Sequence, residues 1–587
     1  MKRLFKILVL LILILTFSSC KGREEVTIIY TNDIHGYIAN TVKDSSGKEV
    51  DGLRLSKIAG YVKSLRNNNK NVVLVDAGDE VQGSIYGAID KGAEMIGIMN
   101  KVGYELATPG NHDFDFGIEG FNRFKSEATF PYISCNFKTS DNKNVLDSYK
   151  IFDISGIKIG FVGISTPETI TTSTPTFFKN DKGEFIYEFV GEKNKEDLYK
   201  IVQDTVDEIR GKVDYVIALG HLGVGLDEER LGIASKNVIK NTTGIDAFID
   251  GHSHTTVESD LVKSKDNKDC VLTQTGCYLD AIGEMTIGLD GKITTKLNKE
   301  LSIVDEEVKT LENSLIQKVN TELGKSVANL EKTLYIYNSK LPEQRLIRAR
   351  ETNMGNFISD SVYWYLNDYK NLDCDLTLIN GGGMRSNIDS GSVTYLNAKS
   401  VQPYGNQVCL IKTKGINIKN ALEMGLTVFE KWDTQWNCPA ENGGFLHAAG
   451  LTFEADGSIP SSVTLDDKNM FKSVDGAYRV KNIKVYNKQT KAYEPLDENK
   501  EYTVGGINYI LRNSGNGLSM FAGSEVVVDY VAEDYTVSVY YMEAFKNANG
   551  EVVVNNANSP IKKYENYLFD YENPNGSGRI TLQNINH

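Results

Sequence analysis

Residues 26–36 read Val-Thr-Ile-Ile-Tyr-Thr-Asn-Asp-Ile-His-Gly, an apolar run followed at once by Asp33 and His35. Residues 26–30 are mostly apolar on successive positions, which is typical of a strand covered on both faces. Similar runs recur at 72–75, 157–162, 213–219 and 245–249, with helical stretches between them. From residue 26 to about 301 the sequence therefore predicts an α/β layered domain.

Polar side chains of the kinds that bind metals follow these runs in glycine-flanked loops. They are Asp33, His35, Asp79, Asn111, His221, His252 and His254. Strand carboxyl ends emerge at one edge of an α/β sheet, so we expect these side chains to converge. A single histidine after a strand is more often structural, but the combination favours a metal site. Seven nitrogen and oxygen ligands exceed one tetrahedral ion and suit two ions that share a carboxylate.

Length and charge narrow the possible functions. The chain has 587 residues, too many for one hydrophobic core, and we expect at least two domains. Lys and Arg number 64 and Asp and Glu 78, which gives a net charge of −14. A field of that sign does not collect phosphate backbones, so nucleic-acid polymers are not expected as partners. A phosphate substrate would need a local cluster of cations.

The first 20 residues have the pattern of an export signal. Lys2, Arg3 and Lys6 precede an apolar run over residues 7–15 that is too short to span a bilayer comfortably. Cys20 follows two serines, as at a lipoprotein cleavage site. We expect residues 1–20 to be a lipoprotein signal peptide, with the chain lipid-anchored in the cell envelope through Cys20. Plain signal-peptidase cleavage and an uncleaved anchor are the alternatives.

The pattern changes beyond residue 303. Residues 304–333 are charged and helix-favouring, with Val308, Leu315 and Val319 at helical spacing. We interpret them as a connecting helix, although the last helix of the first domain fits equally well. Shorter runs, a glycine-rich stretch at 380–385 and many turn signals predict a second, α+β domain over 334–587. The tail from residue 531 either closes that domain or packs on the first.

The other cysteines show no Cys-x-x-Cys pairing, which argues against a thiolate zinc site. They are Cys135, Cys270, Cys277, Cys374, Cys409 and Cys438. Cys270 and Cys277 are the nearest candidates for a disulfide, and buried free thiols fit the sequence equally well.

The motifs in combination resemble a known family. Thr-Asn-Asp-Ile-His-Gly at 31–36, Gly-Asp at 78–79, Gly-Asn-His-Asp-Phe-Asp at 110–115, Gly-His at 220–221 and Gly-His-Ser-His at 251–254 resemble the calcineurin-like metallophosphoesterases. More narrowly, they are similar to the 5′-nucleotidase family of bacterial periplasmic and animal ecto-enzymes. The stretches 350–356, 380–385 and 443–446 match its C-terminal domain.

This resemblance implies a fold with defined domain limits. The expected architecture is a four-layer α/β/β/α metallophosphoesterase domain over 24–303, a connecting helix over 304–333, and a smaller α+β nucleotide-binding domain over 334–587. The metals and the side chains that hold the nucleobase would then lie in different halves. We therefore expect hinge motion near the connecting helix to bring them together.

The resemblance also implies roles for the metal-binding residues. Asp33, His35 and His254 would hold one divalent ion, Asn111, His221 and His252 the other, and Asp79 would bridge them. Zinc, manganese, iron and cobalt all suit this mixed donor set. His112 and Asp115 would form a catalytic dyad in which the imidazole stabilises the phosphoryl transition state. His112 as a further metal ligand is the alternative.

Substrate contacts are expected in the second half. Arg345, Arg348 and Arg385 are candidates for gripping phosphate, although Arg345 matches the family only loosely and a solvated helix face is the alternative for Arg345 and Arg348. Tyr404 and Tyr509 stand where the family usually places two phenylalanines that stack on the base. The remaining candidate substrate residues are Asn380, Gly383 and Asn516. Asn516 replaces a family aspartate that holds the ribose, and His447 is expected to be a packed core side chain.

The function that follows is release of phosphate from nucleoside 5′-monophosphates by water activated on two metals. Alternatives within the fold are a UDP-sugar pyrophosphohydrolase, a 2′,3′-cyclic phosphodiesterase and a thiosulfate-ester hydrolase. A different class is a catalytically silent surface-binding lipoprotein, against which the intact ligand set argues. The sequence leaves the preferred nucleotide, the metal and the oligomeric state open.

Overall fold

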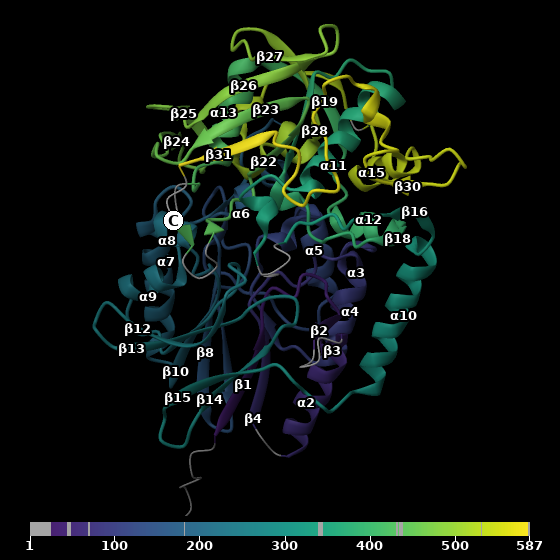
Figure 1. Ribbon diagram of the computed structural model, residues 1–587. Helices are drawn as coiled ribbons and strands as arrows, with labels where there is room; N and C mark the ends of the chain where they lie inside the picture. The colour runs from purple at the N-terminus through teal and green to yellow at the C-terminus, as the bar shows by residue number, and fades with distance from the viewer. Residues whose placement is uncertain are drawn as a thin grey trace, which may run out of the picture.

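Two mixed β-sheets packed face to face form the centre of the N-terminal half in the computed structural model, which describes residues 25–43, 49–68, 71–180, 182–337, 344–429, 432–433, 438–529 and 531–584 (Figure 1). The first sheet has the order β15-β14-β1-β4-β5, with β1 parallel to β4 and antiparallel to β14. Its strands are β1 (Val26–Thr31), β4 (Asn71–Asp76), β5 (Leu106–Ala107), β14 (Ile282–Ile287) and β15 (Ile293–Asn298).

The second sheet has the order β12-β13-β11-β10-β8-β7, and β13, β11, β10 and β8 run parallel. Its strands are β7 (Tyr149–Ile154), β8 (Ile157–Ser165), β10 (Tyr215–His221), β11 (Ala247–Ile249), β12 (Thr256–Lys263) and β13 (Asp269–Thr275). Ile28 and Val75 of the first sheet pack with Phe161 and Ile217 of the second in one buried core. The apolar runs found in the sequence are therefore strands covered on both faces.

Helices cover the outer face of each sheet and complete four layers. On the first sheet lie α2 (Leu55–Asn67), α4 (Ala93–Val102) and α5 (Gly117–Glu127), with α10 (Glu306–Leu323) packed on α2 and α4, and on the second lie α7 (Lys195–Arg210) and α9 (Ser235–Asn241) (Figure 1). In α7, Leu198, Val202, Val206 and Ile209 recur at helical spacing and are buried against the sheet. The predicted α/β/β/α domain is confirmed.

Short elements connect these layers. They are β2 (Ala39–Lys43), β3 (Glu49–Arg54), α3 (Ile85–Ala88), η1 (His112–Phe114), β6 (Phe137–Thr139), α6 (Thr169–Thr172), η2 (Pro175–Phe178), β9 (Tyr187–Phe189) and α8 (Leu226–Leu231).

Helix α10 lies in the predicted connecting segment and packs on α2 and α4. The Asp305 carboxylate caps its first turn by accepting from the Glu307 and Val308 backbone N–H groups. The fully buried Glu312 carboxylate accepts from Ser56 and Arg54 of the N-terminal half. The chain then enters β16 (Ser326–Leu330), which pairs with β18 (Gly391–Thr394) and β30 (Val553–Val554) of the C-terminal half.

The C-terminal half is built on a mixed sheet of order β22-β17-β28-β19-β29. Its strands are β17 (Leu376–Asn380), β19 (Val408–Lys414), β22 (Leu446–Ala449), β28 (Glu501–Ile507) and β29 (Glu525–Val528). The helices of this half are α11 (Asn353–Trp364), α12 (Tyr395–Val401), α13 (Gly415–Gly425), α14 (Asn508–Leu511) and α15 (Asp534–Glu543). Their apolar side chains share one core with this sheet.

A second sheet of the C-terminal half has the order β27-β26-β23-β31. Its strands are β23 (Leu451–Asp456), β26 (Val480–Asn487), β27 (Ala492–Pro495) and β31 (Ile580–Gln583). The remaining elements are η3 (Leu346–Arg348), the π-helical turn η4 (Tyr365–Tyr369), η5 (Gly381–Gly383), β20 (Trp432–Asp433), β21 (Cys438–Pro439), β24 (Val463–Leu465), β25 (Phe471–Val474), η6 (Gly515–Gly517), η7 (Ser519–Phe521) and η8 (Pro560–Lys563).

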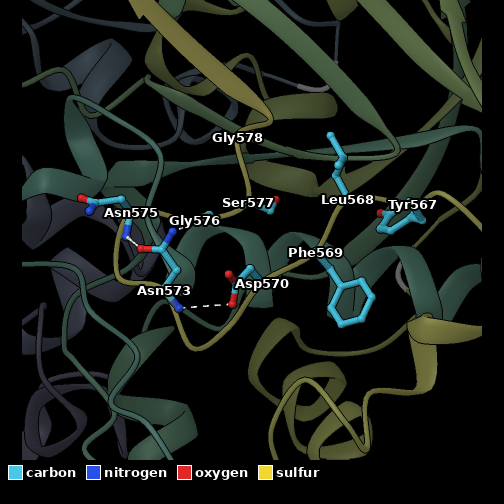
Figure 2. A pocket seen from close by; sticks show the side chains of 9 residues that line it. All are labelled: Tyr567, Leu568, Phe569, Asp570, Asn573, Asn575, Gly576, Ser577 and Gly578. Carbon is cyan, nitrogen blue, oxygen red and sulfur yellow. Dashed lines mark hydrogen bonds between the residues drawn. The ribbon is translucent and has the colours of Figure 1, made fainter.

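The tail closes the C-terminal half through a buried ion pair. Strand β31 pairs in parallel with β23, and Arg579 just before it donates to both oxygens of Asp360 at 2.9 and 2.7 Å. Both side chains are fully buried, and the hydroxyls of Tyr567 and Tyr571 also donate to Asp360 at 2.8 Å. The loop between these groups borders a surface pocket of about 520 Å³, where Asp570 accepts from the Asn573 backbone N–H (Figure 2).

Some expectations fall outside the described residues. They are the predicted export signal and Cys20. Within the described ranges, the thiols of Cys135, Cys270, Cys277, Cys374 and Cys409 are free, so the Cys270–Cys277 pair is not a disulfide. No helix of the described part of the chain has the length and apolarity needed to cross a membrane.

Replacing Asp360 should destabilise the C-terminal half. In Asp360→Asn the Arg579 charge stays buried without its counter-charge, and we expect a loss of about 3–5 kcal/mol in the free energy of unfolding. Differential scanning calorimetry should show the transition of this half at a lower temperature. Asp373→Asn is the control, because Asp373 is 89% exposed and its pairing with Lys488 should contribute only about 0–1 kcal/mol. Equal shifts in the two variants would contradict the assignment.

Candidate metal and phosphate site

The predicted metal ligands come together at the carboxyl ends of the strands of both sheets. Asp33 and His35 follow β1, Asp79 follows β4, and His221 is the last residue of β10. His252 and His254 follow β11, and Asn111 lies in the loop after β5. Segments more than two hundred residues apart thus meet because parallel strands end at a common edge.

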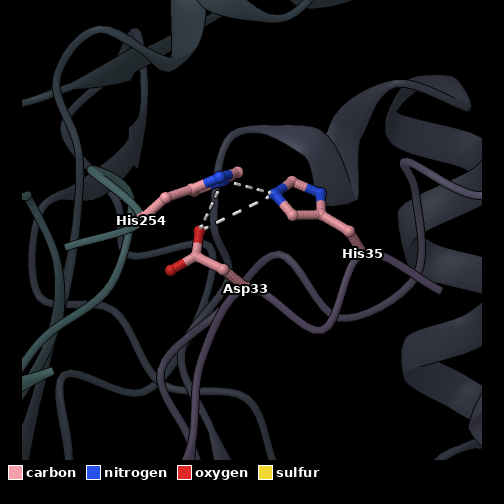
Figure 3. Close-up of side chains that lie close together, drawn as sticks. All are labelled: Asp33, His35 and His254. Carbon is pink, nitrogen blue, oxygen red and sulfur yellow. Dashed lines mark hydrogen bonds and ion pairs between the residues drawn. The ribbon is translucent and has the colours of Figure 1, made fainter. Parts of the chain in front are cut away.

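The ligand atoms form two neighbouring groups. In the first, His35 Nε2 and His254 Nε2 lie 2.8 Å apart and 3.7 and 3.5 Å from Asp33 Oδ1 (Figure 3). The second contains Asp79, His221 and His252, and Asn111 Oδ1 lies 2.9 Å from His252 Nδ1. Asp79 Oδ2 is 3.1 Å from His221 Nε2 and 3.7 Å from His35 Nε2, so this oxygen lies between the groups.

The donor set fits divalent cations. His35 Nδ1 lies 2.6 Å from the Gln82 carbonyl and His221 Nδ1 lies 2.7 Å from the Ala77 carbonyl. A carbonyl only accepts, so each Nδ1 carries a proton and each Nε2 is the ring nitrogen that would face a metal, as in metal-ligating histidines. His221 Nε2 is buried 3.1 Å from Asp79 Oδ2, and His35 Nε2 faces a second imidazole nitrogen. Imidazole nitrogens and carboxylate oxygens that converge in this way are suited to bind a cation.

Burial and charge tune these groups for metal binding. Burial lowers the pKa of His35 and of His254 well below the usual range, so both rings are neutral. Burial alone would raise the pKa of Asp79, but the neighbouring His221 holds it well below the usual range. The bridging position is therefore occupied by an ionised carboxylate.

The ligand loops have a strained backbone. Asp33, His35, Asp79, His252 and His254 all have positive φ angles, between 50° and 81°, which non-glycine residues rarely adopt. The loops brace one another, since the Asp33 N–H donates to the Gly78 carbonyl and the His35 N–H to the Asp79 carbonyl. A Cβ on Gly251 would lie 2.7 Å from His221 Nδ1, so that glycine is required by close approach.

His112 and Asp115 form the expected pair beside the metal groups. His112 Nδ1 lies 2.6 Å from Asp115 Oδ2, while the His112 backbone N–H donates to Asp79 Oδ1 at 2.8 Å. The other Asp115 oxygen accepts from the Ser173 hydroxyl at 3.0 Å, a partner that sequence analysis missed. Because Nδ1 is engaged by the carboxylate, His112 Nε2 is the ring nitrogen left for a substrate.

A buried acidic layer under the ligand loops was also missed. Asp113 accepts from the backbone N–H groups of Asp79 and Gly110 at 3.0 and 2.8 Å, and so fixes two ligand loops at once. Burial raises the pKa of Asp113 to about 6 and the pKa of the neighbouring Glu80 well above the usual range. The only available sequence signal was the position of these acids beside Asp79 and Asn111.

The predicted phosphate arginines lie in the same cavity but in different states. Arg345 donates to Glu441 through its backbone N–H and its Nε, at 2.9 and 2.5 Å, so its charge is neutralised. Arg348 Nε is buried without a partner, and burial together with the charges of Arg345 and Arg385 lowers its pKa to about 9. Arg385 Nη2 donates to the Tyr278 hydroxyl at 3.3 Å. These arginines line the cavity and do not form a solvated helix face.

Both halves of the chain line this cavity, whose volume is about 2030 Å³. The N-terminal half contributes metal-site residues, and the C-terminal half contributes the arginines and the remaining predicted substrate residues Asn380, Gly383, Tyr404, Tyr509 and Asn516. The structure therefore brings all the predicted site residues to one cavity or its floor.

The two predicted clamp tyrosines differ in their contacts. The Tyr404 ring stacks on His112, with ring centroids 5.7 Å apart and planes at 24°. The Tyr509 hydroxyl donates to the Thr171 carbonyl and accepts from the Asn516 N–H, both at 3.2 Å. Asn516 has a left-handed backbone, and its side-chain oxygen accepts from Asn380 Nδ2 at 3.1 Å.

His447 lies outside the cavity. It is fully buried, and its Nε2 is 2.8 Å from the Ile347 carbonyl beside the arginine-bearing turn. Burial lowers its pKa to about 4, so the ring is neutral. This is the packed core side chain that the sequence predicted.

Two family models match the chain. Residues 26–256 match the calcineurin-like phosphoesterases, and residues 327–523 match the 5′-nucleotidase C-terminal domain. A 5′-nucleotidase of Bos taurus is 27% identical over 570 residues, covering 89% of each chain.

Solved structures share the fold. A 5′-nucleotidase precursor of Thermus thermophilus superposes with a TM-score of 0.73 at 23% identity, covering 95% of this chain and 99% of that one. The sulfate thiohydrolase SoxB of the same organism has a TM-score of 0.66 at 14% identity, with coverage of 96% and 98%. The fold alone therefore does not define the ester that is cleaved.

Metal content should follow the two ligand groups. We expect His254→Ala and His221→Ala each to lower the metal content by about one ion per chain, because each removes a ligand from a different group. Asp79→Ala should affect both sites, and His112→Ala should leave the metal content unchanged. Inductively coupled plasma mass spectrometry of the purified, metal-loaded variants provides the measurement. Metal lost from His112→Ala would make His112 a ligand and contradict the dyad.

Proposed function

Because the chain belongs to the 5′-nucleotidase family of calcineurin-like phosphoesterases, we propose that it releases phosphate from nucleoside 5′-monophosphates with the help of two divalent metal ions. The chain is a hydrolase of phosphoric esters. Substrate, metal number and cellular location are the parts that the proposal adds.

One observation carries the proposal. Two metal-ligand groups with an Asp79 oxygen between them adjoin the same cavity as arginines without a full set of acidic partners. A cationic pocket facing a metal centre attracts a dianionic phosphate ester even in a chain of net charge −14. The amide pair of Asn380 and Asn516 offers hydrogen bonds to a sugar, and the Tyr509 ring offers a stacking surface for a base.

We assign the metal ligands as the sequence predicted. Asp33, His35 and His254 would hold one ion, Asn111, His221 and His252 the other, and Asp79 both. When bound, such ions supply Lewis acidity to the phosphoryl group and to the attacking water. The mixed imidazole and oxygen donors suit zinc, manganese, iron or cobalt.

The chain's own residues complete the chemistry. Asp115 accepts the hydrogen bond from His112 Nδ1 and fixes the ring, and a proton on Nε2 would let His112 donate to the negative charge that develops on the phosphoryl group. Arg348 and Arg385 bind and orient the phosphate through charge-assisted hydrogen bonds. Both halves line the cavity, so that the metal-ligand groups and the arginines would face one substrate.

We further propose that the protein is exported and lipid-anchored. The support is the basic segment, the short apolar run and Cys20 at the start of the sequence. In cells given radiolabelled fatty acid, the label should be attached to the expressed chain but not to the Cys20→Ala variant.

A substrate panel tests the proposed activity. The metal-loaded protein should release phosphate from AMP faster than UDP-glucose or 2′,3′-cyclic AMP is cleaved, as measured by phosphate detection and chromatography. His112→Ala should lower kcat by about 100- to 1,000-fold, because it removes a preorganised stabiliser of transition-state charge. Preferential cleavage of UDP-glucose or the cyclic nucleotide, or no cleavage at all, would contradict the proposal.

The arginines should contribute unequally to substrate binding. Arg348→Gln is expected to raise KM for AMP by about 10- to 100-fold, since it removes charge-assisted contacts to the phosphate. The double variant Arg345→Gln with Glu441→Gln removes a pair without net charge and should change KM less. Steady-state kinetics on both proteins gives the comparison, and a larger loss in the double variant would show that Arg345 grips the phosphate.

A further inference from the structure

The Tyr404 hydroxyl is a polar atom in the cavity that lacks a partner within the protein. It is buried, and among the described residues nothing forms a hydrogen bond with it. The Tyr509 hydroxyl, by contrast, is engaged by Thr171 and Asn516. The two tyrosines that the sequence paired as base clamps are therefore not equivalent.

The Tyr404 ring lies against the phosphate-handling groups. It stacks on the His112 imidazole at 5.7 Å, and the Arg385 guanidinium lies 5.8 Å from its centroid. Asp115 holds His112 from one side, and Tyr278 holds Arg385. The ring face that covers His112 is not open to a nucleobase while the halves are arranged in this way.

A buried hydroxyl without a partner costs free energy unless a ligand satisfies it. Burial raises the pKa of Tyr404 above its usual range, although Arg385 opposes the shift, so the hydroxyl keeps its proton. A neutral phenol beside a guanidinium and an imidazole is suited to donate to an anionic oxygen.

We propose that Tyr404 donates a hydrogen bond from its hydroxyl to the phosphoryl group of the substrate, between the contacts made by Arg385 and His112, and that clamping the base is not its main role. This assignment deepens the proposed function and rests on it. It makes Tyr404 a phosphate-binding residue, and it leaves Tyr509 as the stacking surface.

Tyr404→Phe tests the proposal because it keeps the ring and removes only the hydroxyl. Isothermal titration of the metal-loaded full-length protein with inorganic phosphate should show about tenfold weaker binding. Kinetics should show the same factor in kcat/KM for AMP and for ribose 5-phosphate, which carries no base. Tyr404→Leu should weaken phosphate binding at least as much, and serves if the phenylalanine variant fails to fold.

Tyr363→Phe is the matched control. Tyr363 also has a buried hydroxyl without a hydrogen-bond partner, but it lies in the core of the C-terminal half, against Tyr564 and Tyr567. Its removal should leave phosphate binding unchanged. A similar loss in both variants would overturn the proposal, since it would report a general effect of deleting a buried hydroxyl.

The remaining outcomes distinguish a failure of the Tyr404 assignment from a failure of the proposed activity. Phosphate binding in Tyr404→Phe equal to that of the wild type would overturn the proposal, and so would a loss in Tyr404→Leu that is confined to AMP, which is the signature of a base clamp. Weaker phosphate binding in a protein that hydrolyses neither ester would support the Tyr404 contact while refuting the proposed activity.

Discussion

Everything in the site depends on the convergence of imidazole nitrogens and carboxylates at one buried point. Asp33, His35, Asp79 and His221 are almost fully buried and close enough to repel or compete for protons. Such a cluster is stable only where a cation joins it or where the surrounding structure forces it together. Here the strained loops show that force, because several ligands have left-handed backbones braced by bonds between loops. The sheets behind them are the rigid support that sustains this strain.

The C-terminal half places positive charge opposite the metal-ligand groups. Arg348 and Arg385 face the cavity, while Glu441 neutralises Arg345. Burial and the like charges of Arg345 and Arg385 make the charged Arg348 guanidinium costly, and the lowered pKa of Arg348 reflects that cost. A phosphate bound here, as we propose, would relieve these unfavourable interactions. The same reasoning applies to the unpartnered hydroxyl of Tyr404.

Much of the fold and of the candidate site could be predicted from the sequence because local patterns indicate them. Runs such as 26–30 are strands, and the ligands after them, from Asp33 to His254, do meet. What sequence analysis missed depends on contacts between distant segments. Glu441 cancels Arg345 from 96 residues away, Ser173 reaches Asp115 over 58, and Arg579 reaches Asp360 over 219. No periodicity reports such pairs, since they arise only when separate elements pack. Asp113 was visible in its motif, but its task is to bind backbone N–H groups, which residue type alone does not reveal.

The ion pair of Asp360 and Arg579 also has a consequence for biosynthesis. Strand β31 is made after all the other described elements, yet it supplies a strand beside β23 and, just before it, the counter-charge for a residue of α11 that was made 219 residues earlier. On the ribosome, the N-terminal half has all its strands available once β15 has emerged. In the C-terminal half, the buried Asp360 carboxylate has no counter-charge until Arg579 has been made. Nascent chains should therefore fold the N-terminal half well before the C-terminal half, which leaves the latter exposed to chaperones and proteases for longer.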